Sequence, residues 1–204
     1  MGFGTLLLGY LIGCNFVYNE LTDVFGFLLM LYGITSLMAY EERFRLSRLF
    51  LYPLTGISVI AFFFQALQFI GIIGNAQSFL FWYSPARTLL FAGVTVSALQ
   101  AIKGLTKDLE LSKLYLHAYR NQFAAVLYAV LQFYSDFSYP AGSVFSSFAY
   151  YLMLPLLGFG AVLMLFNLKL LFDCMASIGD EEEEARAEAE LPPSLSVGKK
   201  KRRK

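Results

Sequence analysis

The 204-residue chain is 57% hydrophobic and 17% aromatic, and only 15% of its residues are charged. Soluble globular domains average about 45–50% apolar and about 25% charged residues. The composition therefore argues against a soluble enzyme, a nucleic-acid-binding domain and a small disulfide-stabilised domain. A mean hydropathy of +0.57 agrees with this interpretation. We predict an integral membrane protein, an all-α polytopic helix bundle.

Apolar stretches of the length that crosses a bilayer recur along the chain. A spanning helix needs roughly 20 mostly apolar residues. We identify six candidates: 3–18, 24–40, 52–74, 88–102, 123–139 and 145–172. The fourth is long enough if residues 79–83 form its end, whereas the first is short and could lie in the interface instead. The sequence therefore predicts six transmembrane helices, or five if the first does not span.

The charged residues divide the chain into two parts. Residues 1–176 form the predicted transmembrane bundle. Residues 177–204 are charged and contain proline, a composition typical of disordered segments, and they are predicted to form a disordered cytoplasmic tail. Within it, 181–190 could form a transient helix.

Basic residues alternate between the predicted connections. The connections after the second and fourth stretches are basic, as is the tail, and they contain Arg43, Arg45, Arg48, Lys103, Lys107, Lys113, Arg120 and Arg186. The connections at 19–23, 75–78 and 140–144 contain no Lys or Arg. Since basic connections stay on the cytoplasmic side, both termini are predicted to be cytoplasmic, in the cell membrane.

Polar residues near the outer ends of the spans form the candidate site. Arg87 begins the fourth span and Asp136 lies near the end of the fifth, at similar depth. The remaining candidates at this level are Gln68, Gln132 and Tyr83, and Asp23 in the first outer connection lies there too. Because ionisable groups inside a membrane are costly, they suggest a functional site. We expect an outward-facing cavity for a small polar or anionic solute.

A structural interpretation of the same residues stays open. Arg87 and Asp136 could form an ion pair or reach the headgroups, while the glutamines hydrogen-bond between helices. The glycines, including Gly9 and Gly13, favour close helix packing.

Catalytic and cofactor signatures are missing from the sequence. The single histidine, His117, has no Cys, Asp or Glu at metal-binding spacing, and no phosphate-binding glycine loop is present. We therefore expect no enzymatic activity, no cofactor and no metal.

Two functions fit the sequence. The first is a small-solute binding or transport module that works with other membrane subunits, because the chain has no ATP-binding segment. The second is a membrane scaffold or regulator that acts through its cytoplasmic loops and tail. In either case the terminal basic cluster is predicted to contact anionic lipid headgroups; it consists of Lys199, Lys200, Lys201, Arg202, Arg203 and Lys204.

Overall fold

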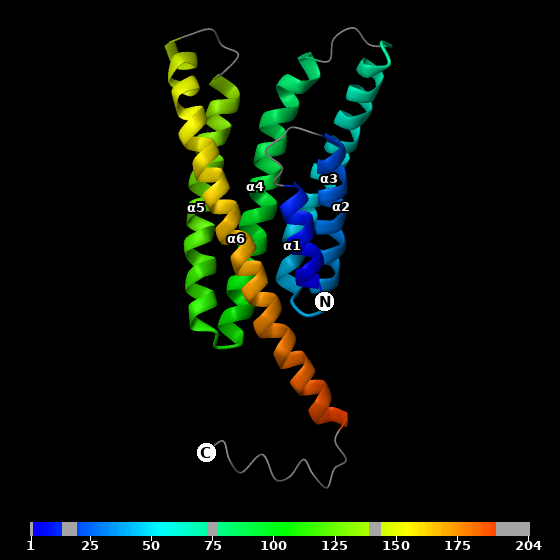
Figure 1. Cartoon of the computed structure of the whole chain (residues 1–204), viewed down its shortest axis with the longest axis vertical. Helices are drawn as coiled ribbons and strands as arrows, with labels where there is room; N and C mark the ends of the chain where they lie inside the picture. The colour runs from blue at the N-terminus through cyan, green and yellow to red at the C-terminus, as the bar shows by residue number, and fades with distance from the viewer. Residues whose placement is uncertain (1, 14–19, 73–76, 139–143, 191–204) are drawn as a thin grey trace.

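The computed structural model is all-helical in the residues that it describes, 2–13, 20–72, 77–138 and 144–190 (Figure 1). Six α-helices and one 3-10 helix follow one another: α1 (Gly2–Gly13), α2 (Glu20–Leu37), η1 (Glu42–Phe44), α3 (Arg45–Phe69), α4 (Gln77–Asp108), α5 (Ser112–Ser138) and α6 (Val144–Glu190). Each of the six predicted stretches corresponds to one α-helix. The prediction of an all-α bundle is confirmed for the described part of the chain.

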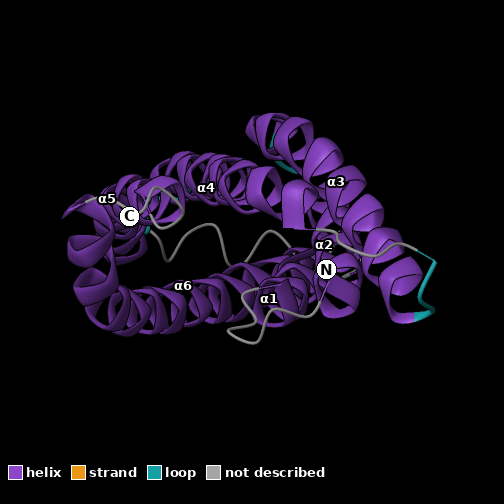
Figure 2. Cartoon of the chain, turned by 90° about the horizontal axis from the view of Figure 1, so that it is seen from above, coloured by secondary structure: helices purple, strands orange, loops and turns teal. Residues whose placement is uncertain are grey.

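The six α-helices form a ring in chain order. Each α-helix packs against the next one along the chain, and α6 also packs against α1. Viewed along the bundle, α4 lies across the ring from α1 and α6 (Figure 2). Contacts across the ring join α4 to α1 and α2, through the Phe91 ring with those of Tyr10 and Phe27.

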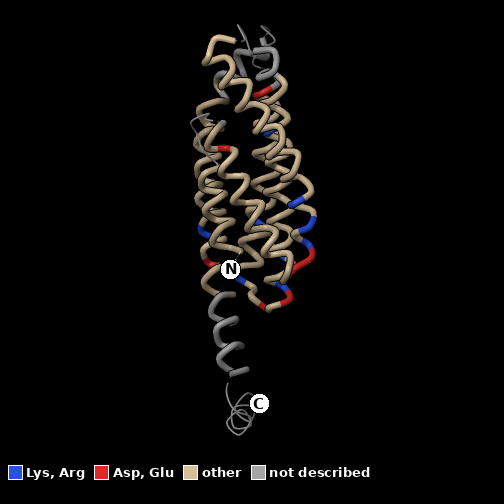
Figure 3. Tube along the Cα trace, turned by 90° about the vertical axis from the view of Figure 1, so that its right-hand side faces the viewer, with Lys and Arg blue, Asp and Glu red and all other residues tan. Residues whose placement is uncertain are grey.

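Successive helices run in opposite directions. The connections after α2 and α4 lie at the lower end of Figure 1, near the N-terminus, and most of the charged residues of the described part lie toward this end (Figure 3). The basic connections thus share one end of the bundle, as the alternation of charge predicts. We call this end the lower end and the opposite one the upper end.

Local backbone geometry produces the turns at the ends of two helices. Gly71 after α3 and Glu110 after α4 have positive φ angles of 81° and 58°. In both turns the next residue donates its N–H to a carbonyl five residues earlier, Ile72 to Leu67 and Leu111 to Thr106. This pattern terminates a helix by satisfying its last carbonyls.

Three helical segments are long and apolar enough to cross a membrane, within the residues described: Glu42–Phe69, Trp82–Asp108 and Met153–Ile178. Two apolar helices are shorter, Gly2–Gly13 and Leu21–Leu37. With 12 residues, α1 reaches only about 18 Å at a rise of 1.5 Å per residue. That is less than the hydrocarbon thickness of about 30 Å, so the described residues of α1 are by themselves too few to cross it.

The longer helices differ in their ends from the predicted stretches. The helix α4 starts at Gln77 and therefore includes residues 79–83, as expected for a fourth stretch of spanning length. The helix α6 continues through Pro155 and then to Glu190. The sequence predicts disorder from Ser177, with a transient helix over 181–190; in the structure 177–190 continue α6, where Ala, Glu and Arg are strong helix formers. The basic cluster 199–204 lies outside the described residues.

Candidate functional site

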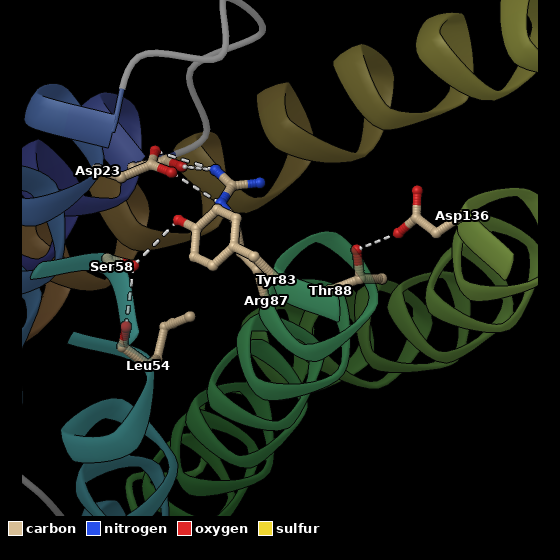
Figure 4. A network of polar contacts seen from close by, with 8 residues as sticks. Asp23, Leu54, Ser58, Tyr83, Arg87, Thr88 and Asp136 are labelled. Atoms are coloured by element: carbon tan, nitrogen blue, oxygen red, sulfur yellow. Dashed lines mark hydrogen bonds and ion pairs between the residues drawn. The ribbon is translucent and has the colours of Figure 1, made fainter. Parts of the chain in front are cut away.

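Polar side chains from four helices gather in the upper half of the bundle (Figure 4). We call this set the upper polar layer; it comprises Asp23, Ser58, Tyr83, Arg87, Thr88, Gln132 and Asp136. The helix α4 is its centre, because Tyr83, Arg87 and Thr88 all lie on that helix and contact α3, α2 and α5 in turn.

Arg87 forms a buried ion pair with Asp23. Its Nε lies 2.7 Å from Asp23 Oδ2 and its Nη2 lies 2.9 Å from Asp23 Oδ1, an arrangement with two parallel hydrogen bonds. The Arg87 and Asp23 side chains are 18% and 5% exposed. Nη2 also donates to the carbonyl of Gly13, at 3.4 Å. The guanidinium therefore links α4 to both α1 and α2.

Asp136 has a different set of partners. Thr88 donates a hydrogen bond of 2.7 Å to Asp136 Oδ2, and Gln132 donates one of 2.9 Å to Oδ1. Consecutive residues on a helix point about 100° apart, so Arg87 faces α2 while Thr88 faces α5. An ion pair between Arg87 and Asp136 was one of the interpretations left open by the sequence; the structure gives the two residues different partners, Asp23 for Arg87, and Thr88 and Gln132 for Asp136.

Tyr83 is buried and its hydroxyl lies 3.3 Å from Ser58 Oγ on α3. Ser58 also donates to the carbonyl of Leu54, at 2.9 Å. Gln68 is exposed near the end of α3, so the structure does not bring it into the upper polar layer. Of the predicted site residues, Tyr83 and Arg87 lie toward α2 and α3, and Gln132 and Asp136 lie together at α5.

A second polar group, absent from the sequence predictions, connects α1, α5 and α6. Asn121 Nδ2 donates to Asn167 Oδ1 at 3.1 Å, and Asn167 Nδ2 donates to the Tyr10 hydroxyl at 2.8 Å. We call these three residues the central polar chain. Asn121, Asn167 and Tyr10 are 2%, 3% and 6% exposed. An amide within the apolar stretch 145–172 was the signal that could have identified Asn167.

Most buried hydroxyls in the described helices bond to their own backbone. Thr55, Ser58, Ser97 and Thr106 each donate to the carbonyl four residues earlier. Thr95 is an exception. The residue is 7% exposed, and its buried Oγ1 has no hydrogen-bond partner in the part of the chain that the structure describes.

The lower end of the bundle has polar contacts that are more exposed. Arg43 Nη1 lies 3.3 Å from Asp108 Oδ2, with both side chains more than half exposed. Lys103 donates to Gln122, which in turn donates to Gln100. The Arg43–Asp108 contact joins the connection after α2 to the end of α4, and the contacts of Gln122 join α4 to α5.

The described side chains show no group of three or more His, Cys, Asp and Glu residues that could hold a metal ion. Comparison with known proteins gives no match: no family model, no curated protein and no solved structure is similar to this chain. The site must therefore be interpreted from its own geometry.

Proposed function

We propose that the chain is a multi-pass membrane protein whose helix ring binds a small polar solute, as a binding or transport module. The observation that carries the proposal is the distribution of polarity: large apolar side chains cover the outside, and polar side chains lie inside. Phe69, Phe123 and Leu154 are 93%, 72% and 80% exposed. Asp23, Asn121 and Asn167 are at most 4% exposed.

Lipid is the solvent that makes this distribution favourable. In water, exposed apolar area of this extent would be costly, because burial is worth about 25 cal/mol per Å². In hydrocarbon, polar groups must instead find partners within the protein. The basic connections at the lower end support a cytoplasmic location for that end and for both termini.

The polar interior supports solute binding. Binding sites in helix bundles lie between the helices, with a few polar groups set among apolar ones. The ring has polar groups from α1, α4, α5 and α6 directed into such a setting. The upper polar layer lies at the upper end of this interior, where a solute from outside would arrive.

The proposal is tested with the purified protein in detergent. Carbonate extraction should leave the chain in the membrane pellet, and detergent should release it. A panel of small neutral, anionic and cationic solutes is then screened for an increase in melting temperature. At least one solute should raise it for the wild type and not for Asn167→Leu, with Leu165→Ala on the exposed face of α6 as the control. A panel in which no solute has any effect would argue against a binding module.

A scaffold function has one observation in its favour. The helix α6 extends to Glu190, beyond the lower ends of the other helices (Figure 1). A projecting helix offers a surface to partner proteins. Deleting residues 180–204 should abolish co-purification of a partner on this alternative, and leave solute binding unchanged on the first.

A further inference from the structure

Thr95 is the starting point, because its hydroxyl departs from the pattern of its neighbours. A threonine in an apolar helix normally donates to the carbonyl one turn earlier, as Thr55 and Thr106 do here. Thr95 Oγ1 is buried and has no such partner within the described residues. Buried polar atoms without a partner are rare, and each calls for an explanation such as a bound ligand.

The helical spacing places Thr95 on the interior side of α4. Thr95 is four residues after Phe91 and seven after Thr88, so its direction about the helix axis lies between the directions of these two residues. The Phe91 ring stacks on Tyr10 of α1, with centroids 5.7 Å apart, and contacts Phe27 of α2 at 5.9 Å. This face of α4 is thus directed across the ring toward α1.

The central polar chain lies on the other side of the same interior. Tyr10, whose ring stacks on Phe91, also accepts a hydrogen bond through its hydroxyl from Asn167, and Asn167 accepts one from Asn121. Figure 2 shows α4 across the ring from α1 and α6. Tyr10 therefore contacts both the Phe91 ring on α4 and the Asn167 amide on α6, and it links the side of α4 that bears Phe91 to the central polar chain.

The chemistry of this region selects an uncharged ligand. Thr95, Asn121 and Asn167 are neutral, and they supply hydroxyl and amide groups that both donate and accept hydrogen bonds. Arg87 lies one helical turn from Phe91, but its charge is matched by Asp23. Asp136 contacts α4 at Thr88, about two helical turns from Thr95. A charged solute would lose its hydration without gaining a counter-charge, and this cost is high in an apolar interior.

We propose that the ring interior between Thr95 and the central polar chain binds a small uncharged solute with both hydrogen-bond donors and acceptors, such as an amide or a polyol. This inference rests on the proposed solute-binding function, and of the polar or anionic solute expected from the sequence it keeps the uncharged polar class. Thr95 contacts the solute through its hydroxyl, and the Tyr10 and Phe91 rings pack on its apolar part.

Binding is measured by equilibrium dialysis of the purified protein with radiolabelled probes. The neutral probes are acetamide, glycerol and glucose; acetate and ethylammonium are charged probes similar in size to acetamide. The wild type should bind at least one neutral probe and neither charged one. Thr95→Val should weaken that binding at least tenfold. Thr35→Val, at an exposed threonine that bonds to its own helix, should leave it unchanged.

The possible results separate the two proposals. If the wild type binds none of the five probes, both the proposed function and this inference fail. If it binds a charged probe in preference, the function stands and the neutral ligand is wrong. If Thr95→Val binds as the wild type does, the function stands and the location is wrong.

Thermal melting without ligand is an independent check on the hydroxyl. Thr95→Val replaces an unpaired hydroxyl by a methyl group, so its melting temperature should equal or exceed that of the wild type. Thr55→Val removes a paired hydroxyl and should lower it. An equal decrease in both variants would show that Thr95 has a partner within the protein, and would overturn the inference.

Discussion

Arg87 and Arg43 each pair with one aspartate, but the two pairs differ in their access to water. The Arg87–Asp23 side chains are 18% and 5% exposed, and the Arg43–Asp108 side chains are 52% and 57% exposed. Removing one partner of a buried pair leaves a charge without compensation, whereas an exposed charge is solvated and screened.

We expect Arg87→Met and Asp23→Asn each to lower the free energy of unfolding by about 3–5 kcal/mol. The double variant should lose less than the sum of the two, because neither charge is then left unpaired. The matched replacements Arg43→Met and Asp108→Asn should cost about 0–1 kcal/mol each. Denaturation in mixed detergent micelles measures all of these. Equal losses at the two pairs would show that the upper pair is not buried in the folded protein.

From the sequence, the positions of the polar residues along the helix axes were easier to predict than their hydrogen-bond and ion-pair partners. Arg87, Asp136 and Asp23 were assigned to the same level, because depth follows from position along a span. Which of them meet depends on the rotation of α4 about its axis and on which helices flank it. Neither quantity is encoded in a hydrophobic stretch that is apolar all round. For the same reason, the contact between Asn167 and Tyr10, 157 positions apart, could not be predicted.

At the scale of elements, glycines determine how α1 and α2 pack. A Cβ added at Gly9 would lie 2.5 Å from the backbone N of Met30, and one at Gly33 would lie 2.6 Å from the backbone N of Leu6. Because these neighbours are backbone atoms, the two helices would have to separate. The predicted role of Gly9 in close packing is confirmed.

We therefore expect Gly9→Ala and Gly33→Ala to destabilise the protein by about 1–3 kcal/mol each, the usual cost of overpacking. Gly158 on α6 is the matched control, since a Cβ there meets no atom within 4 Å. Gly158→Ala should stabilise by about 0.5–1 kcal/mol through helix propensity alone. Melting temperatures in detergent give the order of the three variants. If Gly158→Ala destabilised the protein as much as Gly9→Ala and Gly33→Ala do, close packing of α1 against α2 would not explain the loss of stability.

The elements themselves were largely predictable. Apolar stretches and alternating basic connections predicted six helices. The boundaries differ most where charged or polar residues extend a helix beyond its apolar stretch, at the start of α5 and at the end of α6. The apolar stretch at 3–18 extends beyond the described end of α1. The α6 helix is longer than expected because the charged residues after Ser177 that suggested disorder are also good helix formers.

At the scale of the whole molecule, the ring is closed by contacts between α1 and α6, the helices farthest apart in sequence. A Cβ added at Gly4 of α1 would lie 3.4 Å from the Met175 sulfur on α6. The central polar chain joins the same helices through Tyr10 and Asn167. In the membrane that we propose as the environment of the chain, opening this seam would expose the polar interior to lipid, where unsatisfied polar groups are costly.

Cysteines introduced as Gly4→Cys and Met175→Cys should therefore cross-link through a short bismaleimide, in a background with Cys14 and Cys174 replaced by Ala. The cross-linked chain should migrate differently on a denaturing gel and should melt at a higher temperature, because the link restrains the seam. Gly4→Cys with Leu165→Cys is the control, since Leu165 is 62% exposed on α6 and lies ten residues closer to the upper end. If the control pair links as efficiently as the first, α1 and α6 do not form a fixed seam, and the six helices do not enclose a common interior.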